Sequence, residues 1–567
     1  MERLPGFNVA NVFEKRALLI AINSIAALSI FFFGYDQGPY LCPQASLPRV
    51  MGGVNNAKHY IDLMGFGYVD EKTGNPVVTN SLLQGGIISV YYLGTLFGCL
   101  LGGWIGDKIG RIKTIALGAG WAIFGASLQT AAMNSNWMIG SRAVNGIGTG
   151  ILNAVVPVWA TETSEHTSRG QFIAIEFTLN IFGVVVAYWL EFGLSYNGDF
   201  PSPSRSPSRT LTSVPPRPPP QPPPPSNLKH ITSIFPLTLG SLKIIPLLVL
   251  LGAVWFFPES PRYLVKAGRD EEAQYILRRL RGSTGDDLIR ANIEYQEIRN
   301  VIATESQESK KTSYLHMLFG IGSGNLHTGR RVQLVIWLQI LQEWVGIAGV
   351  TVYAPTIFRV AGFDSQKSQW ISGLNNIFYA FATLICVFTL DRIGRRWTLW
   401  WGAAGQGIAM FLAGAFSQLG EDAARNGDVD KASSYGAAAA SFVFIFTSIF
   451  GATWLTVPWL YPAEIFPLHV RSQGNAWGVV GWSIGIGATT LHIFGIANII
   501  SIPVVWALYP ETNQRTLEEV DLLFASPSPW VWDAEKTFAR LKAEQPVIRV
   551  AKDAGPVGDI ENRRGSD

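Results

Sequence analysis

The chain has 567 residues, of which 48% are apolar and 15% are charged, and its formal net charge at pH 7 is +3. A soluble domain carries roughly a quarter charged residues, so this composition is typical of a membrane protein. The small net charge gives no reason to expect nucleic acid as a partner. The cysteines Cys42, Cys99 and Cys386 are scattered, without a CxxC motif or a disulfide framework, and we expect no metal and no cofactor.

Apolar stretches recur along most of the chain. About 20 helical residues cross the hydrocarbon core of a bilayer, and most of the stretches are long enough to do so. They cover residues 17–38, 84–106, 114–133, 137–160, 172–194, 243–257, 332–358, 370–390, 397–418, 436–460 and 474–509. The sequence therefore predicts an all-α, polytopic membrane protein.

The first stretch ends in "FGYDQG", which places Asp36 at the end of an apolar run. An ionised carboxylate in lipid costs roughly 2.5–3.5 kcal/mol on insertion scales, so such residues are usually functional. The next segment, "PYLCPQASLPR" (39–49), contains Pro39 and Pro43, which should stop the helix beside the acid. Asp36 is therefore the first candidate functional residue.

Basic residues gather in alternate connections, the pattern that marks loops facing the cytoplasm. They follow the second and the eighth stretch and recur through residues 259–331, whereas "MNSN" (133–136) has no charge. We therefore expect both termini in the cytosol. The 259–329 stretch has a helical pattern, with acids early and bases late in "RDEEAQYILRRLRG", and Tyr275, Ile276 and Leu280 form an apolar stripe. It predicts a small helical domain rather than a plain linker.

These boundaries divide the chain into five parts. We expect a cytosolic N-terminus (1–16), a first six-helix bundle (17–258), the intracellular helical linker (259–329), a second bundle (330–524) and a cytosolic tail (525–567). The first bundle contains two inserts, 39–49 and the Pro/Ser-rich segment 198–230, of which the second has a disordered or polyproline composition.

Two spans are shorter than expected. The sixth, 243–257, is barely long enough to cross, and between Arg471 and "PETNQR" the residues 472–509 must cross the membrane twice. Two crossings need about 40 residues plus a turn, so we predict a truncated eleventh helix. Our hypothesis is a faulty gene model, with intron sequence retained at both inserts and an exon lost in the eleventh helix; real variation of a lineage is the alternative.

Three motifs occur twice in the same order. "GGWIGDKIGR" (102–111) matches "FTLDRIGRRW" (388–397), "PVWATETSEHTSRGQ" (157–171) matches "PWLYPAEIFPLHVRSQG" (458–474), and "PESPRYL" (258–264) matches "PETNQRTLEEVD" (510–521). An ordered repeat of this kind indicates two related bundles, as in transporters with parallel halves.

These motifs resemble the sugar porter family of the major facilitator superfamily, in particular its fungal proton-coupled hexose and polyol members, from about Ala17 to Phe524. The resemblance implies a cytosolic network of gating charges that locks the outward-facing state and parts when the halves rock. The alternative is charge that only sets topology, which does not explain the paired acids. The network would comprise Asp107, Arg111, Glu162, Arg169 and Glu259 in the first half and Asp391, Arg395, Glu464, Arg471 and Glu511 in the second.

The resemblance also implies a substrate path. "LQILQEWVGIAGVTVYAP" (338–355) is similar to the Gln-Gln-x-x-Gly-Ile-Asn motif of the seventh helix, with Gln342 at the first Gln, Glu343 in place of the second and Ala348 where Asn would stand. Buried amides that only join helices, and tryptophans that only line the membrane interface, are the structural alternatives. The candidate substrate-binding residues are Gln339, Gln342, Glu343, Asn375, Asn376, Trp459 and Glu176.

"FGYDQG" also matches the first-helix motif of proton-coupled sugar porters, where the acid takes and releases the driving proton. Arg142, in "SRAVNGIGTG" (141–150), is the expected partner of Asp36. Burial raises the pKa of a carboxyl and a nearby Arg lowers it, so movement of the partner switches the acid between two states. A fixed structural Asp36–Arg142 pair is the alternative.

The sequence as a whole predicts a plasma-membrane importer of a monosaccharide or sugar alcohol that works by proton symport and alternating access. No ATP-binding P-loop, nucleophile constellation or metal cluster occurs, so we expect no enzyme. We expect a monomer in the bilayer whose partners are the substrate and the proton. A passive facilitator and a non-transporting nutrient receptor of the same fold are the alternatives.

Overall fold

The computed structural model describes residues 8–37, 64–69, 76–165, 167–196, 234–308, 313–321, 327–347, 365–484 and 491–544, with the single positions 350, 351, 354, 358 and 363. The two predicted inserts, 39–49 and 198–230, lie outside the described residues, as does Ala348.

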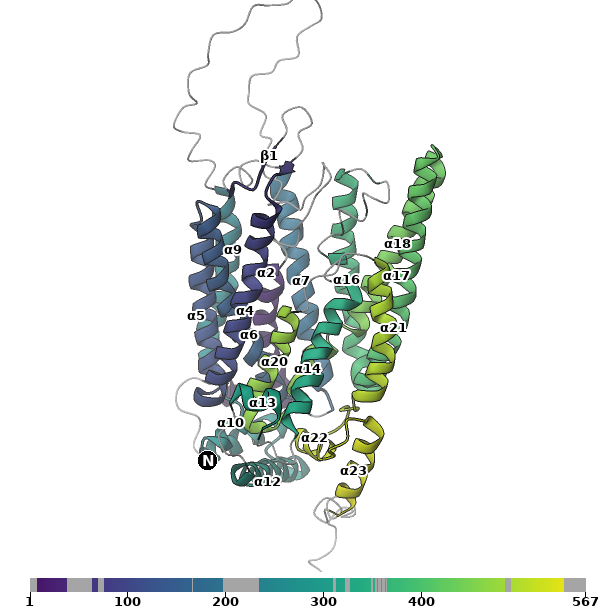
Figure 1. The fold of residues 1–567 in the computed structure, drawn as a ribbon. Helices are drawn as coiled ribbons and strands as arrows, with labels where there is room; N and C mark the ends of the chain where they lie inside the picture. The colour runs from purple at the N-terminus through teal and green to yellow at the C-terminus, as the bar shows by residue number, and fades with distance from the viewer. Residues whose placement is uncertain are drawn as a thin grey trace, which may run out of the picture.

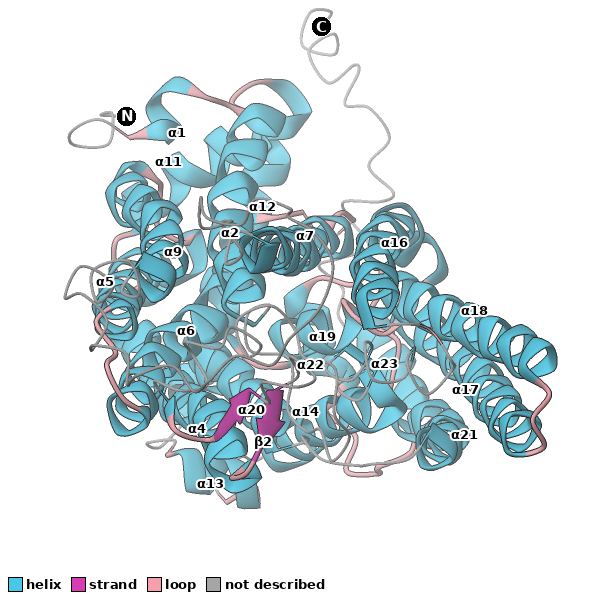
Figure 2. Cartoon of the chain, turned by 90° about the horizontal axis from the view of Figure 1, so that it is seen from above, coloured by secondary structure: helices cyan, strands magenta, loops and turns pink. Residues whose placement is uncertain are grey.

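Two groups of long helices run side by side (Figures 1 and 2). The first group comprises α2 (Lys15–Gln37), α4 (Ser81–Ile109), α5 (Arg111–Thr130), α6 (Ser135–Thr163), α7 (Arg169–Tyr196) and α9 (Ile234–Ala253). The second comprises α14 (Thr328–Gln342), α16 (Ser365–Ile393), α17 (Arg395–Arg425), α18 (Val429–Thr453), α19 (Val457–Ile465), α20 (Arg471–Ile484) and α21 (Leu491–Leu508). This is the all-α, two-bundle architecture that the sequence predicts.

Short elements complete the chain. A two-stranded antiparallel hairpin joins β1 (Gly67–Val69) to β2 (Pro76–Val78) before α4. Single turns occur at η2 (Val254–Phe256), η4 (Glu343–Ile347) and η5 (Leu468–Val470). The remaining helices are α1 (Val9–Val12), α10 (Pro261–Lys266), α11 (Asp270–Arg281), α12 (Gly285–Glu308), α13 (Tyr314–Phe319), α22 (Leu517–Leu523) and α23 (Val531–Glu544). We call the end of the bundles at which α10, α12 and α22 lie the linker end (Figure 1).

Seven helices of the described residues are long and apolar enough to cross a membrane. They cover Lys15–Asp36, Ser89–Ile109, Ser135–Thr163, Arg169–Leu190, Lys367–Ile393, Arg395–Arg425 and Val429–Ile465. Two shorter apolar helices, Lys243–Phe256 and Ala497–Leu508, accompany them. The chain is therefore a multi-pass membrane protein.

The sixth and the eleventh helix were both predicted to be short. The sixth is longer than the predicted 243–257, because α9 already begins at Ile234 and thereby carries Lys243 into the bundle. The described part of the eleventh helix, α20, has 14 residues and is followed directly by residues outside the described part of the chain, so its truncation stays a prediction.

Small residues allow the closest helix contacts in the first bundle. A Cβ on Gly94 or Gly98 of α4 would lie 2.2 or 2.1 Å from the carbonyl oxygen of Ala143 or Ile147 in α6. On α6, a Cβ on Gly146 would lie 2.3 Å from the Tyr91 carbonyl oxygen. In a bilayer, where lipid removes most of the hydrophobic drive between helices, such close packing is a main source of association.

The linker helices are fastened to the N-terminal segment and to one another. Burial alone would raise the pKa of Glu294 in α12, but Arg281 of α11, 2.7 Å away, outweighs it, and with Arg262 nearby the pKa falls to about 2. Lys15 at the start of α2 lies 2.8 Å from Asp287 of α12. The predicted stripe is largely buried, since Ile276 and Leu280 of α11 belong to the apolar core.

Candidate functional site

The first charge network lies at the linker end between α5 and α6. Arg111, the first residue of α5, makes a two-point contact with Glu162 near the end of α6: Nε to Oε2 at 2.9 Å and Nη2 to Oε1 at 3.0 Å. Asp107 lies 3.5 Å from the same guanidinium. Glu259 accepts hydrogen bonds from the backbone amides of Arg111 (2.9 Å) and Ile112 (3.2 Å), so a carboxylate meets the positive end of the α5 dipole.

The second bundle repeats this arrangement. Arg395, the first residue of α17, binds Glu464 of α19 through Nη2 to Oε1 at 2.8 Å and Nε to Oε2 at 3.2 Å. Asp391 lies 2.9 Å from Arg395. Glu511 accepts from the backbone amides of Arg395 (2.9 Å) and Arg396 (3.0 Å). The repeated motifs of the sequence therefore fold into the same contacts twice.

Each network depends on one glycine. Gly110 and Gly394 precede the two arginines with φ of 98° and 94°, a left-handed backbone that glycine adopts without the penalty a Cβ brings. A Cβ would also lie 2.4 Å from Oε2 of Glu259 at the first position and 2.5 Å from Oε2 of Glu511 at the second. The glycine therefore both makes the turn and leaves room for the capping carboxylate.

Contacts between the two bundles concentrate at the same end. Arg471 of the second bundle lies 3.3 Å from Glu162 of the first. Asp391 accepts from the amides of Gly170 (3.1 Å) and Gln171 (2.8 Å) at the start of α7, and Arg169 donates to the Arg515 carbonyl at 3.2 Å. All ten residues predicted as gating charges thus take part in contacts at the linker end, and four of them, Glu162, Arg169, Asp391 and Arg471, reach across to the other half.

Farther inside, an aromatic cluster joins the two bundles. Trp459 of α19 lies 5.8 Å from Phe33 of α2, 5.3 Å from Phe177 of α7 and 5.8 Å from Trp482 of α20, measured between ring centroids. Tyr92 of α4 lies 5.1 Å from Trp482. Trp459 was predicted; the other four rings were not, because single aromatic residues in apolar helices carry no pattern that separates them from ordinary lipid-facing or core residues.

The two predicted glutamines of α14 bind the start of α19 and the turn that precedes it. Gln339 Nε2 donates to the Pro458 carbonyl at 2.9 Å, and Gln342 Nε2 donates to the carbonyls of Trp454 (2.9 Å) and Leu455 (3.0 Å). Both side chains are buried, and both Oε1 atoms lack a hydrogen-bond partner among the described residues. Each amide therefore joins two helices and still offers one acceptor.

Glu343 lies directly after these glutamines, where α14 gives way to the wide turn η4. Gly346 within this turn has φ of 113°, and such interruptions of a helix often occur at functional sites. Glu343 is buried, and Trp482 lies close enough to its carboxyl to interact with it. The carboxyl is thereby linked to the aromatic cluster.

The other predicted substrate residues are more scattered. Asn375 of α16 accepts a 2.8 Å hydrogen bond from the Thr447 hydroxyl of α18, a contact within the second bundle, and Asn376 is buried beside it in the sequence. Glu176 of α7 is completely buried, and both of its carboxyl oxygens lack a hydrogen-bond partner among the described residues. Asn180, one turn on, donates to the Ile30 carbonyl at 3.1 Å.

Asp36 lies in a third setting, inside the first bundle, with 0% of its surface exposed. Its Oδ1 lies 2.8 Å from Nζ of Lys243 in α9, and Asn145 of α6 donates to its Oδ2 at 2.5 Å. Lys243 also donates to Oε1 of Gln129 in α5 at 2.5 Å. The acid therefore has a buried ion pair and an amide donor where four helices meet.

This geometry corrects one expectation. Arg142 was named as the ion-pair partner of Asp36, and the structure gives that place to Lys243. The guanidinium of Arg142 lies 5.1 Å from the ring centroid of Tyr91 in α4. The sequence alone did not identify Lys243, because this lysine is the first residue of the predicted sixth span, where a lysine is expected at the membrane interface. In the structure α9 begins earlier, at Ile234, and Lys243 therefore lies within the helix.

Comparisons with known proteins agree with this architecture. A family model described as "Sugar (and other) transporter" matches residues 22–524. The sugar transporter STL1 of Saccharomyces cerevisiae is 29% identical over 549 residues, covering 91% of this chain and 84% of that protein. The arabinose-proton symporter of Escherichia coli is 28% identical over 460 residues, covering 78% and 86%.

Solved structures give the same result for the fold. The proton:xylose symporter XylE bound to 6-bromo-6-deoxy-D-glucose matches with a TM-score of 0.69 at 20% identity, covering 90% of this chain and 99% of that one. These named relatives are transporters, which confirms the expectation that the chain is not an enzyme. Since the family model spans nearly its whole length, the chain belongs to the sugar transporter family and has the major facilitator fold.

Proposed function

We propose that this chain imports a monosaccharide or a sugar alcohol by proton symport, with the linker end and both termini in the cytosol of a cell whose plasma membrane it spans. The observation that carries the proposal is the completely buried Asp36, held by Lys243 at 2.8 Å. A buried charge is costly unless it is paired, and ionisable residues inside a membrane protein mark ion or proton pathways by default.

Proton coupling would follow from competition between the proton and two side chains, Lys243 and Asn145, for the carboxylate of Asp36. In the structure, Lys243 and Asn145 both bind the Asp36 carboxylate. When α9 and α6 move relative to α2, loss of these partners leaves a buried carboxylate that favours the protonated form. We assign proton uptake and release to Asp36, with Lys243 as the primary counter-charge and Arg142, beside Tyr91, as a second cation on the same path.

Alternating access would use the charges at the linker end. Arg471–Glu162 and the contacts of Asp391 with Gly170 and Gln171 tie the halves together there. These bonds are mutually exclusive with an opening at that end, so they favour the state open to the opposite side. Inward opening requires that they part, and substrate and proton binding would supply the compensating free energy.

The substrate site is the region between Gln339, Gln342, Glu343 and the aromatic cluster. Sugars present hydroxyls that need hydrogen-bond partners and C–H faces that pack on aromatic rings. The Oε1 atoms of both glutamines, which lack partners among the described residues, would accept hydrogen bonds from the sugar hydroxyls, and Trp459 would supply an aromatic face. Glu176 is a further candidate because its buried carboxyl lacks a hydrogen-bond partner among the described residues.

The test is to express the chain in yeast that lacks its own hexose carriers and to record external pH while sugars and polyols are added. Alkalinisation with one substrate, abolished by Asp36→Asn, supports symport and identifies the cargo. Glu421→Gln is the matched control, since Glu421 is an exposed acid paired with Arg425 on the surface of α17. Uptake without alkalinisation would instead support a passive facilitator. Surface expression without any uptake would favour the receptor alternative.

A further inference from the structure

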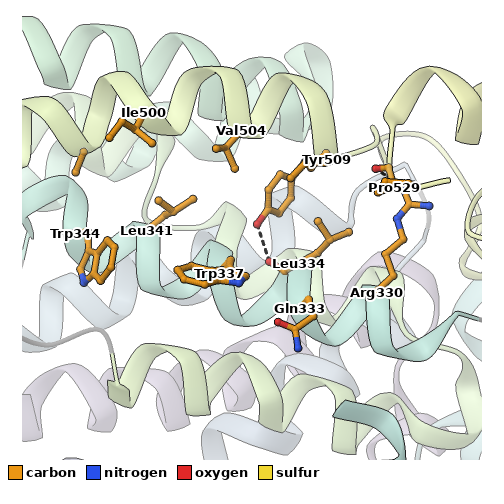
Figure 3. A pocket seen from close by; sticks show the side chains of 12 residues that line it. Arg330, Gln333, Leu334, Trp337, Leu341, Trp344, Ile500, Val504, Tyr509 and Pro529 are labelled. Carbon is orange, nitrogen blue, oxygen red and sulfur yellow. Dashed lines mark hydrogen bonds between the residues drawn. The ribbon is translucent and has the colours of Figure 1, made fainter. Parts of the chain in front are cut away.

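A groove lies on the second bundle between α14 and α21, with a volume of about 600 Å³ (Figure 3). Its walls are almost entirely apolar. α14 contributes Leu334, Trp337 and Leu341, which recur three and four residues apart and so share one helix face. α21 contributes Ile500 and Val504 from its facing side. Two helices thus present apolar faces to each other without closing the space between them.

Two hydrogen bonds join α14 and the adjoining η4 to α21 and the residue that follows it, one toward each end of this groove. The Tyr509 hydroxyl donates to the Leu334 carbonyl at 2.8 Å (Figure 3), and Asn498 Nδ2 donates to the Val345 carbonyl at 2.9 Å. From Leu334 to Val345 the chain rises about 16 Å at 1.5 Å per residue. One leaflet of a hydrocarbon core about 30 Å thick measures about 15 Å. The part of the groove between these two hydrogen bonds therefore has about the length of one leaflet.

The groove is open toward the bilayer. Trp337 and Trp344, which stand on its rim, keep 49% and 44% of their surface exposed. Helices in membranes pack as closely as side chains permit, and an unfilled space of this size would forfeit dispersion contacts along both walls. A flexible hydrocarbon chain from the surrounding lipid fits both the shape and the chemistry of the walls.

The linker end of the groove carries a positive charge. Arg330 is the one charged side chain among the described lining residues. Its guanidinium donates to the carbonyls of Pro529 (3.0 Å) and Ser526 (3.4 Å), while Nε is buried without a hydrogen-bond partner. The described residues place no carboxylate within ion-pair distance of Arg330. Arginine binds phosphate oxygens by charge-assisted hydrogen bonds, so the groove offers a cation where a lipid headgroup would lie.

We propose that this groove is a binding site for one anionic phospholipid of the leaflet at the linker end, with an acyl chain between α14 and α21 and the phosphate at Arg330. The site is separate from the proposed substrate path, because Gln339 and Gln342 leave α14 toward α19. A bound chain would hold α14 against α21, where the two pinning hydrogen bonds already join them. The inference concerns lipid binding and does not depend on the proposed transport.

The test is native mass spectrometry of the full-length chain in detergent, titrated with phosphatidylglycerol or with phosphatidylcholine of the same acyl chains. We expect one tightly bound phosphatidylglycerol, with an affinity about tenfold above that of phosphatidylcholine, because phosphatidylcholine offers the same phosphate but also carries a choline cation that weakens its attraction to Arg330. Arg330→Gln should remove that tenfold preference. Val504→Trp, which fills the groove, should remove the bound lipid, whereas Ile408→Trp on the exposed face of α17 should not.

Two results would overturn the proposal. Equal affinity of wild type and Arg330→Gln for phosphatidylglycerol would reject Arg330 as the headgroup site. Retention of the lipid by Val504→Trp, at the level of Ile408→Trp, would reject the groove. The Arg330→Gln comparison can be made even where Val504→Trp does not fold, because it changes none of the apolar side chains that line the groove. Since no sugar uptake is measured, a negative result leaves the proposed transport function untouched.

Discussion

The charges at the linker end occur in two matching sets, whereas the buried charges around Asp36 occur once. Arg111, Glu162 and Glu259 repeat as Arg395, Glu464 and Glu511, down to the backbone amides that the last acid of each set caps. The Asp36–Lys243 pair has no such copy, since α14 to α21 contain no buried lysine–carboxylate pair among the described residues.

This difference separates two roles. The duplicated charges fit the proposed task that both halves would perform alike, which is closure of the linker end. The single charge pair fits the proposed task that only one half would perform, which is proton binding at one acid. The symmetry is also incomplete at the linker end: Glu162 binds Arg111 and, across the interface, Arg471, whereas Glu464 binds Arg395 and the Thr512 hydroxyl.

The largest effect is expected at the unduplicated pair. Lys243→Met leaves Asp36 buried with Asn145 as its remaining donor among the described residues, and breaking a buried pair from one side costs about 3–5 kcal/mol. The double variant Asp36→Asn with Lys243→Met removes both charges and should recover most of that stability. Thermal unfolding in detergent measures both. If the stability loss of the double variant equals the sum of the two single losses, Asp36 and Lys243 are not energetically coupled.

The sequence predicted the duplicated charges and missed half of the single pair, and the reason is physical. A repeat compares a chain with itself, so "GDKIGR" and "LDRIGRR" identify Arg111 and Arg395 without a structure. Lys243 has no counterpart to reveal it. Its partner depends on where α9 begins and on how four helices meet, and those are tertiary properties that a linear apolar pattern does not contain.

The same limit applies to the proposed substrate region. Gln339, Gln342 and Trp459 lie in recognisable motifs, and the structure brings them together along α14 and α19. Phe33, Phe177, Tyr92 and Trp482 join them from four other helices. An aromatic residue in an apolar helix gives no local sign of which neighbour it will face, so only the fold identifies this cluster.

The incomplete symmetry at the linker end predicts unequal responses to equivalent substitutions. Arg395→Ala leaves the buried Glu464 with a hydroxyl donor alone, whereas Arg111→Ala leaves Glu162 with Arg471 at 3.3 Å. We expect Arg395→Ala to cost about 3–5 kcal/mol and Arg111→Ala to cost about 1–3 kcal/mol less, because a charged partner remains. Melting temperatures of the two purified variants test this. Equal losses would mean that Arg471 does not compensate.

The linker helices should loosen as the pH falls below the ordinary pKa of a glutamate. The pKa of Glu294 is about 2 in the folded chain, against an ordinary value of about 4.3. Its contribution is complete above pH 4.3 and is lost as pH falls toward 2, and a difference of about two units amounts to about 3 kcal/mol. Hydrogen exchange of α11 and α12 measured from pH 5 to pH 3 should report this loosening. Glu294→Gln should flatten the profile, and an unchanged profile in that variant would assign the acid response elsewhere.

The smallest effects are expected at the two turn glycines, and they compare the halves most directly. Gly110→Ala and Gly394→Ala each force a Cβ onto a backbone with φ of 98° and 94° and ψ of 169° and 164°, a conformation essentially confined to glycine that costs about 1–3 kcal/mol, and press it against Glu259 or Glu511. Because φ and the distance to the carboxylate are nearly the same at both positions, the two losses should agree within about 0.5 kcal/mol. Gly120→Ala in α5, where an added Cβ meets nothing within 4 Å, is the control and should not destabilise the chain. A large difference between the stability losses of Gly110→Ala and Gly394→Ala would mean that one capped turn contributes more to the stability of the chain than the other. The two halves would then share the geometry of this turn but not its energetic contribution.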